Sequence, residues 1–115
     1  MIPKTAEPKP YRILFVCSQN KLRSPTAQVV FADVEGVRAL SAGTNHDAET
    51  PLSGDLVEWA DMIACMERTH RGKLTKAHAP LLRDKAVTVL GIPDDYAYMD
   101  PALVGLIKGM FPRWF

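Results

Sequence analysis

The sequence has few cysteines, no excess of charge of either sign and no long apolar run. Its 115 residues include two cysteines, Cys17 and Cys65, which are too few for a disulfide-stabilised scaffold. The 14 basic residues balance 13 acidic ones, so the net charge of +1 argues against a nucleic-acid partner or a membrane surface. No segment approaches the ~18 apolar residues of a membrane span, and the first residues lack the apolar stretch of a signal peptide. We therefore expect a cytoplasmic protein with reduced thiols.

The length and composition also bound the domain organisation. A chain of this size can bury one hydrophobic core but not two. Residues 1–10 hold three prolines and two lysines, a composition that favours a flexible N-terminal tail. We predict one α/β domain over 11–115 after this tail. The three histidines form no ligand cluster with the cysteines, so we expect no metal and no other cofactor.

Short apolar runs alternate with segments of helical period from Tyr11 onward. This alternation is typical of βαβ units joined by right-handed crossovers. It predicts a three-layer α/β sandwich with a four-stranded parallel sheet in the order 2-1-3-4. In such a sheet, ligands bind at the carboxyl ends of strands where the strand order reverses, which directs attention to the loop after the first strand. The predicted strands are 13–16, 37–42, 62–66 and 86–90, and the predicted helices follow Ser24, Thr50, Met66 and Asp100.

The loop after the first strand reads Cys17-Ser18-Gln19-Asn20-Lys21-Leu22-Arg23-Ser24. Backbone amides that curl at a helix N-terminus attract an anion, and nothing in this loop is acidic. A helix N-terminus and a guanidinium favour the thiolate of a cysteine, which makes Cys17 a candidate nucleophile. Arg23 presents a planar fork of donors that can hold two phosphate oxygens at once. Ser24 either donates to this thiolate or caps the helix that follows.

A cysteine and an arginine separated by five residues occur a second time, at Cys65 and Arg71. Glu67 lies inside this second segment, where its charge would repel a phosphate. We therefore interpret Cys65 as a small buried apolar side chain.

Hydrolysis of a phosphate monoester also needs a proton for the leaving oxygen. The loop after the fourth strand carries two acids, of which Asp94 is the preferred general acid and Asp95 the alternative. Acid-rich turns are also often turns without a catalytic role. Asp100 precedes Pro101 and is expected to cap the last helix, whose apolar face would be Leu103, Leu106, Ile107 and Met110.

The segment from Val16 to Pro25 resembles the signature of the low-molecular-weight protein tyrosine phosphatases. Three further segments are similar to that family in the same order, namely 40–44, 61–66 and 93–96. The resemblance implies a flavodoxin-like sheet and metal-free hydrolysis through a phosphocysteine intermediate on Cys17. Arg23 would hold the phosphate with the loop 18–24, and Asp94 would be the general acid. Ser24 would stabilise the thiolate, and Asn20 and Ser41 would hold the loop in shape, Asn20 in a left-handed conformation.

The resemblance implies a phosphorylated protein or a small aryl phosphate as substrate, with inorganic phosphate or sulfate as ligands. Three residues depart from the family pattern: Gln19 replaces a glycine, Leu22 a second loop cysteine and Asp95 a proline. Tyr96 could wall a pocket for an aryl group or pack over the last helix.

Two other functions stay open. An arsenate reductase resembles the same fold and loop but needs further cysteines, of which the chain offers only Cys65. A phosphate- or phosphopeptide-binding module would keep the anion site without turnover.

Overall fold

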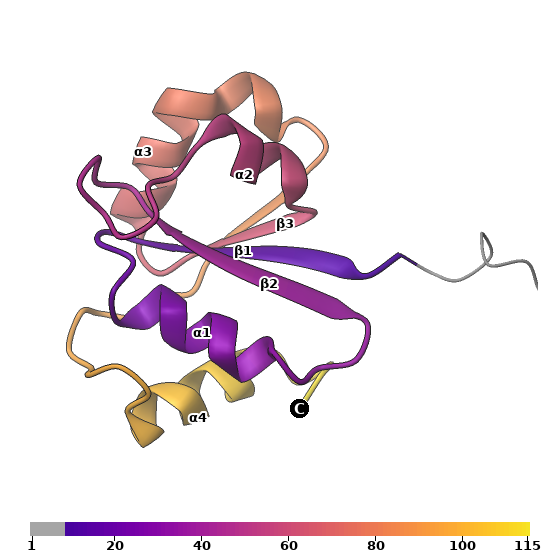
Figure 1. Cartoon of the computed structure of the whole chain (residues 1–115), viewed down its shortest axis with the longest axis vertical. Coiled ribbons are helices and arrows are strands. Elements are labelled where there is room, and N and C mark those ends of the chain that lie inside the picture. Colours follow the sequence, from indigo (N-terminus) through magenta and orange to yellow (C-terminus); the bar gives the residue numbers. More distant parts are fainter. Residues whose placement is uncertain (1–8) are drawn as a thin grey trace, which may run out of the picture.

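The computed structural model describes residues 9–115, and the tail predicted over 1–10 lies, up to residue 8, outside the described residues. Four parallel strands form one sheet in the order β2-β1-β3-β4, which confirms the predicted topology. Helices α1 and α4 cover one face of the sheet, and α2 and α3 cover the other (Figure 1). In chain order the elements are β1 (Tyr11–Cys17), α1 (Arg23–Phe31), β2 (Val37–Gly43), α2 (Gly54–Trp59), β3 (Met62–Cys65), α3 (Arg68–His78), the 3-10 helix η2 (Ala79–Leu82), β4 (Ala86–Val89) and α4 (Pro101–Met110).

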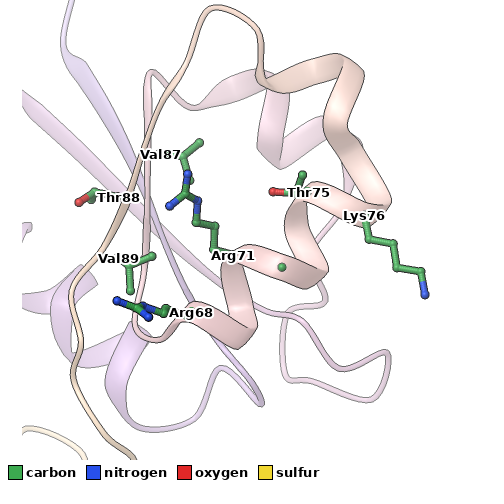
Figure 2. A pocket seen from close by; sticks show the side chains of 8 residues that line it. Arg68, Arg71, Thr75, Lys76, Val87, Thr88 and Val89 are labelled. Carbon is green, nitrogen blue, oxygen red and sulfur yellow. The ribbon is translucent and has the colours of Figure 1, made fainter.

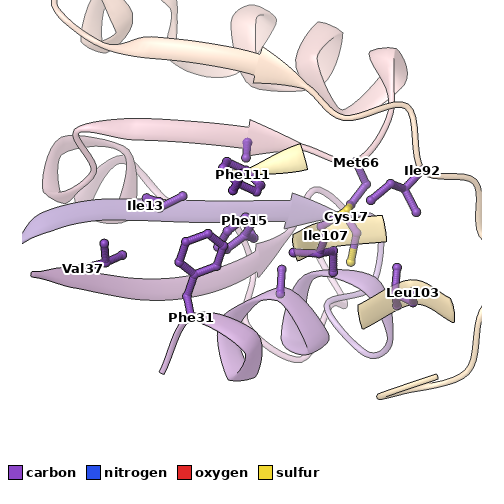
Figure 3. Packing of buried hydrophobic residues seen from close by; sticks show 12 residues of the cluster. Ile13, Phe15, Cys17, Phe31, Val37, Met66, Ile92, Leu103, Ile107 and Phe111 are labelled. Carbon is purple, nitrogen blue, oxygen red and sulfur yellow. The ribbon is translucent and has the colours of Figure 1, made fainter. Parts of the chain in front are cut away.

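Strand β1 is the centre of the core, because it is fully buried on both faces from Ile13 to Val16. Successive side chains of a strand point to opposite faces. Ile13 and Phe15 therefore pack under α1 and α4 (Figure 3), and Leu14 and Val16 pack under α2 and α3. Cys17 continues the first series, which brings its side chain to the α1 and α4 side of the sheet.

Aromatic rings close one end of the core on the α1 and α4 side. Phe31 lies with its ring centroid 5.4 Å from that of Phe15 and 5.1 Å from that of Phe111. Trp114 packs edge-on against Phe31 at 5.6 Å, and Phe115 does so at 5.2 Å. The aromatic residues near the C-terminus thus cover the hydrophobic core.

Helices α2 and α4 differ from the prediction in where they begin or in what they bury. Helix α2 begins at Gly54 rather than at Thr50, because residues 50–52 run beside the end of β2 and Pro51 forms a bridge with Gly43. Ser53 then caps the helix by accepting from Leu56 N. In α4 Asp100 is the cap, as predicted, but Leu106 and Met110 are exposed and only Leu103 and Ile107 reach the core.

Within residues 9–115, no helix has the length and apolar character that crossing a membrane requires.

Candidate active site

The loop between β1 and α1 lies at the carboxyl end of the sheet, and the segment 44–49 holds its outer side. Three hydrogen bonds join the two segments, from Thr44 N to Cys17 O (2.9 Å), from Asn45 N to Ser18 O (3.0 Å) and from Glu49 N to Gln19 O (3.0 Å). Because these bonds turn the loop carbonyls outward, the amides between them face the other way.

Gly43, the last residue of β2, makes this close packing possible. A Cβ atom at this position would lie 2.5 Å from Ser18 O and 2.5 Å from the Cβ atom of Ala48. No side chain fits there without displacing the loop. In the sequence, Gly43 appears only as the end of a strand, because a contact with a distant loop leaves no local pattern.

The loop amides form a set of unpaired donors. Among residues 9–115, the amides of Ser18, Gln19, Lys21 and Leu22 donate to no acceptor. They lie at the N-terminus of α1, where the partial positive charge of the helix adds to their own. This is the geometry that binds a phosphate oxygen without a metal.

Cys17 lies beside three groups that can donate to its sulfur or orient a donor. Its Sγ atom is 2.9 Å from Ser24 Oγ, and Asn20 N donates to it at 3.3 Å. Asn20 Nδ2 donates to Ser24 Oγ at 2.9 Å, so the Ser24 hydroxyl proton can go to the sulfur at 2.9 Å or to the more distant Ala42 carbonyl at 3.5 Å. Asn20 has a φ of 58°, the left-handed conformation that the family resemblance implies.

The capping role considered for Ser24 is wrong. Helix α1 begins one residue earlier than that role requires, at Arg23, and its N-cap Leu22 makes no side-chain cap. Ser24 is fully buried and turned toward Cys17. A Ser-Pro pair is compatible both with a helix cap and with a donor to the thiolate, so the sequence could not distinguish the two roles of Ser24.

The Arg23 side chain is buried, with 3% of its surface exposed, and is fixed at one end. Its Nη1 atom donates to Glu67 Oε2 at 2.7 Å and to the Ile92 carbonyl at 2.8 Å. Its Nε atom lies 3.6 Å from Asp94 Oδ1. Among the described residues Nη2 has no acceptor, so the guanidinium is oriented by Nη1 and keeps donors for a phosphate.

Glu67 has a different role from the one its sequence position indicates. It is the N-cap of α3, with a capping box to His70, and its carboxylate pairs with Arg23. The hydrogen bond from Arg23 holds the pKa of Glu67 below its usual range. The second cysteine–arginine segment therefore supplies the carboxylate that orients the arginine of the first. Glu67 comes directly after β3 and Met66, and β3 lies beside β1 in the sheet. This position was the one signal in the sequence that could have placed Glu67 near the cysteine loop.

His70 links α3 to the loop. Its Nδ1 atom accepts from Glu67 N at 3.0 Å, so Nε2 carries the proton and donates to Ser18 Oγ at 2.9 Å. The side chain is 1% exposed. Burial, and to a smaller extent the charge of Arg23, lower the pKa of His70 to about 4. The imidazole is therefore neutral near pH 7 and acts as a fixed donor to Ser18.

This buried imidazole predicts acid sensitivity of the fold. The unfolded histidine takes up a proton below its ordinary pKa of 6.5, whereas the folded one does so only near pH 4. The unfolded state therefore binds more protons in this window. We expect the His70 contribution to lower the free energy of unfolding by about 3 kcal/mol between pH 7 and pH 4. Urea unfolding of wild type and His70→Asn at pH 7, 5.5 and 4 measures it.

Asparagine is the matched control because its side-chain oxygen can still accept from Glu67 N, but it does not titrate. The variant should lose less stability on acidification than the wild type. Parallel pH dependences of the two proteins would contradict the assignment to His70.

The two candidate acids differ in their surroundings. Asp94 is 65% exposed and forms an ion pair with Arg23, whereas Asp95 is exposed and has no cationic partner among residues 9–115. Their loop is tied to the sheet by the buried Ile92, whose amide donates to Met66 O at 2.9 Å. Asp94 is thus the acid that lies beside the cysteine loop.

The structure places two other predicted residues away from the loop amides. Ser41 donates to Gln28 Oε1 at 2.6 Å, so it joins β2 to α1, and the described residues show no bond from it to the loop. Tyr96 is half-buried and packs against the core cluster under α1 and α4. Tyr98, by contrast, is 51% exposed.

Cys65 is enclosed on the other side of the sheet. It is fully buried in the cluster under α2 and α3, and desolvation raises its pKa to about 12. Cys17 therefore has no accessible second thiol with which to form the disulfide of an arsenate reductase.

Comparison with known proteins was made at the level of sequence and of structure. No family model and no curated protein matches the sequence. Among solved structures, the chain is similar to the YwlE arginine phosphatase from Geobacillus stearothermophilus, with a TM-score of 0.73 and 21% identity over 90% of this chain and 92% of that one. It is also similar to the low-molecular-weight protein tyrosine phosphatase from Streptococcus pyogenes, with a TM-score of 0.73 and 16% identity over 91% and 93%.

A third similar structure is the tyrosine phosphatase Wzb from Escherichia coli in complex with phosphate, with a TM-score of 0.70 and 20% identity over 90% of this chain and 94% of that one. The chain therefore has the fold of the low-molecular-weight protein tyrosine phosphatases that its sequence resembles.

Proposed function

We propose that the protein is a cysteine-dependent phosphomonoester hydrolase that acts on phosphotyrosine in proteins. One observation carries the proposal: Cys17 and the buried Arg23 flank a loop of unpaired amides, and Ser24 lies 2.9 Å from the cysteine sulfur. A site built only to hold phosphate needs the amides and the arginine. A hydroxyl within hydrogen-bond distance of the sulfur can in addition stabilise the thiolate, both as the nucleophile and as the leaving group.

The proposed first step is attack by the Cys17 thiolate on phosphorus. An S–P bond forms, the ester P–O bond breaks, and its electron pair stays on the leaving oxygen, which takes the proton of Asp94. The loop amides and Arg23 stabilise the charge on the three phosphate oxygens of the transition state. Ser24 stabilises the thiolate before attack by donating to it.

In the second step, water attacks the phosphocysteine and gives its proton to the Asp94 carboxylate. The S–P bond breaks, and the electron pair returns to the sulfur, where the Ser24 hydroxyl again stabilises the thiolate. The products are inorganic phosphate and the dephosphorylated hydroxyl compound, and the enzyme regains its starting state. None of these steps calls for a cofactor.

Tyrosine is the proposed substrate residue because similar structures are named tyrosine phosphatases, and the Wzb protein of Vibrio vulnificus was solved with benzylphosphonate, which carries an aryl group. The YwlE relative is named an arginine phosphatase, so phosphoarginine is the comparison substrate. We further infer that residues 11–115 work as one domain and that the protein acts in the cytoplasm, where its free cysteines stay reduced.

Substitutions in the loop that carries Asp94 and Asp95 test the proposal. Asp94→Asn should lower kcat by about 10²–10⁴-fold on phenyl phosphate or a phosphotyrosine peptide, because the basic leaving oxygen then departs unprotonated. The loss should be smaller on p-nitrophenyl phosphate, whose leaving group needs less help. Steady-state phosphate release measures both.

Asp95→Asn is the matched control, since it removes the same charge from the next position. It should stay within about threefold of the wild type. Equal losses in the two variants, or a loss that does not depend on the leaving group, would contradict the general-acid role of Asp94.

A further inference from the structure

An open groove of about 970 Å³ lies between α3 and β4 (Figure 2), and none of its lining residues belongs to the cysteine loop. Strand β4 is the last strand of the sheet, and none of residues 9–115 pairs with its outer side. The groove floor is formed by Val87, Thr88 and Val89, all half-buried, and its wall by the exposed face of α3. A half-buried strand with a free edge is a place where an extended peptide can add.

The backbone of β4 offers hydrogen bonds along this edge. Ala86 N donates to Asp61 O and Leu90 N to Cys65 O, so these residues face β3. Backbone groups alternate from side to side along a strand, and those of Val87 and Val89 therefore face away from β3. An added strand would find two outward residues to pair with.

The groove has charge of one sign. Arg68 and Arg71 are exposed, and in Figure 2 both side chains extend from α3 toward β4, whereas Lys76 points away. No residue that lines the groove is acidic, and neither arginine has a carboxylate partner among residues 9–115. Two unpaired guanidinium groups over a strand edge select carboxylates, which they can bind in a bidentate manner.

The groove continues to the candidate active site. A second cavity, of about 360 Å³, shares Arg68 and Val89 with the first and extends to Glu67 and Pro93. Glu67 pairs with Arg23, and Pro93 precedes Asp94, so this cavity ends beside the phosphate-binding groups. From Arg68 to Thr75 the helix rises about 10 Å, which three residues of an extended chain span.

We propose that this groove binds the acidic flank of a phosphorylated protein substrate, which adds to the edge of β4 as an extended segment with its carboxylates on Arg68 and Arg71. The inference rests on the proposed function, to which it adds a substrate class: phosphotyrosine with aspartate or glutamate a few residues away. It also gives a role to the arginines of the second cysteine–arginine segment, which the phosphate site does not use.

The test compares two phosphotyrosine peptides of equal length, one with acidic and one with serine flanks. We expect wild type to favour the acidic peptide in kcat/KM by roughly five- to tenfold, and Arg71→Ala to bring the ratio close to one. Arg71→Glu should reverse the preference. Arg38→Ala is the matched control, because it removes an equal charge from an exposed residue of β2, the opposite edge of the sheet, and should keep the wild-type ratio.

A binding measurement separates this inference from the proposed function. Fluorescence anisotropy of the labelled acidic peptide on Cys17→Ser reports on the groove without turnover, with Cys17→Ser/Arg71→Ala and Cys17→Ser/Arg38→Ala beside it. Weaker binding with Arg71→Ala alone supports the groove even where wild type hydrolyses nothing. Equal binding by the two double variants overturns it even where wild type is an active phosphatase. Self-association that Arg71→Ala abolishes would assign the groove to a second copy of the chain and also overturn the proposal.

Discussion

Cys17→Ser is expected to abolish phosphate release from an aryl phosphate, a loss on the order of 10⁵-fold or more in kcat. A serine hydroxyl is not ionised near neutral pH and is a poor leaving group from phosphorus. The substitution is nearly isosteric at a position that is 3% exposed, and an oxygen there can keep the contact with Ser24. Phosphate release by wild type and variant between pH 5 and 8 measures the effect.

The same variant decides between an enzyme and a binding module. In the proposed site the loop amides and Arg23, not the sulfur, are the donors for phosphate, so Cys17→Ser should still bind it. Binding is followed by the rise of the unfolding temperature with added phosphate. Cys65→Ala is the control, because it removes the other thiol, which lies in the opposite core cluster, and should keep turnover. A wild-type protein that binds phosphate without turnover would instead be the binding module.

The sequence predicted the sheet because its strands carry strong local signals. The run Ile13-Leu14-Phe15-Val16 is apolar at every position, as a strand buried on both faces requires, and the structure leaves none of the four exposed. Helix α2 was misplaced because Thr50-Pro51 looks like a helix start. The Thr50-Pro51 segment instead pairs with the end of β2. This pairing depends on Gly43, a distant partner that no local sequence pattern shows.

The candidate site also has one part that could be predicted from the sequence and one part that could not. The candidate nucleophile Cys17 and Arg23 lie within one short segment, and residue chemistry was enough to select them, whereas the left-handed Asn20 of the same segment came from the resemblance to a family. The groups that fix that segment come from elsewhere: the amides of 44–49, Glu67 and His70. Glu67 was read by its charge as an obstacle to phosphate, and its pairing with Arg23 is a contact across 44 positions. Such contacts follow only once the strand order is known.

Arg23→Lys should be the second most damaging substitution, with a loss of about 10³–10⁵-fold in kcat. A lysine keeps the charge, but its single ammonium group cannot hold two phosphate oxygens while also bonding Glu67 and the Ile92 carbonyl, as the planar guanidinium is placed to do. Aryl phosphate turnover measures the loss. Urea unfolding of the same protein checks that the buried position still folds.

Glu67→Gln is the control that separates the role of Arg23, which would hold the phosphate, from that of Glu67, which orients Arg23. A glutamine oxygen can still accept from Arg23 Nη1, and the backbone amide of residue 67 can still donate to His70 Nδ1. The arginine then keeps its orientation and loses only a charged partner, so kcat should fall by less than about tenfold. If Glu67→Gln were as inactive as Arg23→Lys, the carboxylate itself would have to take part in the reaction. If Arg23→Lys kept near wild-type turnover, a point charge would suffice, and the bidentate hold on the transferred phosphate would be wrong.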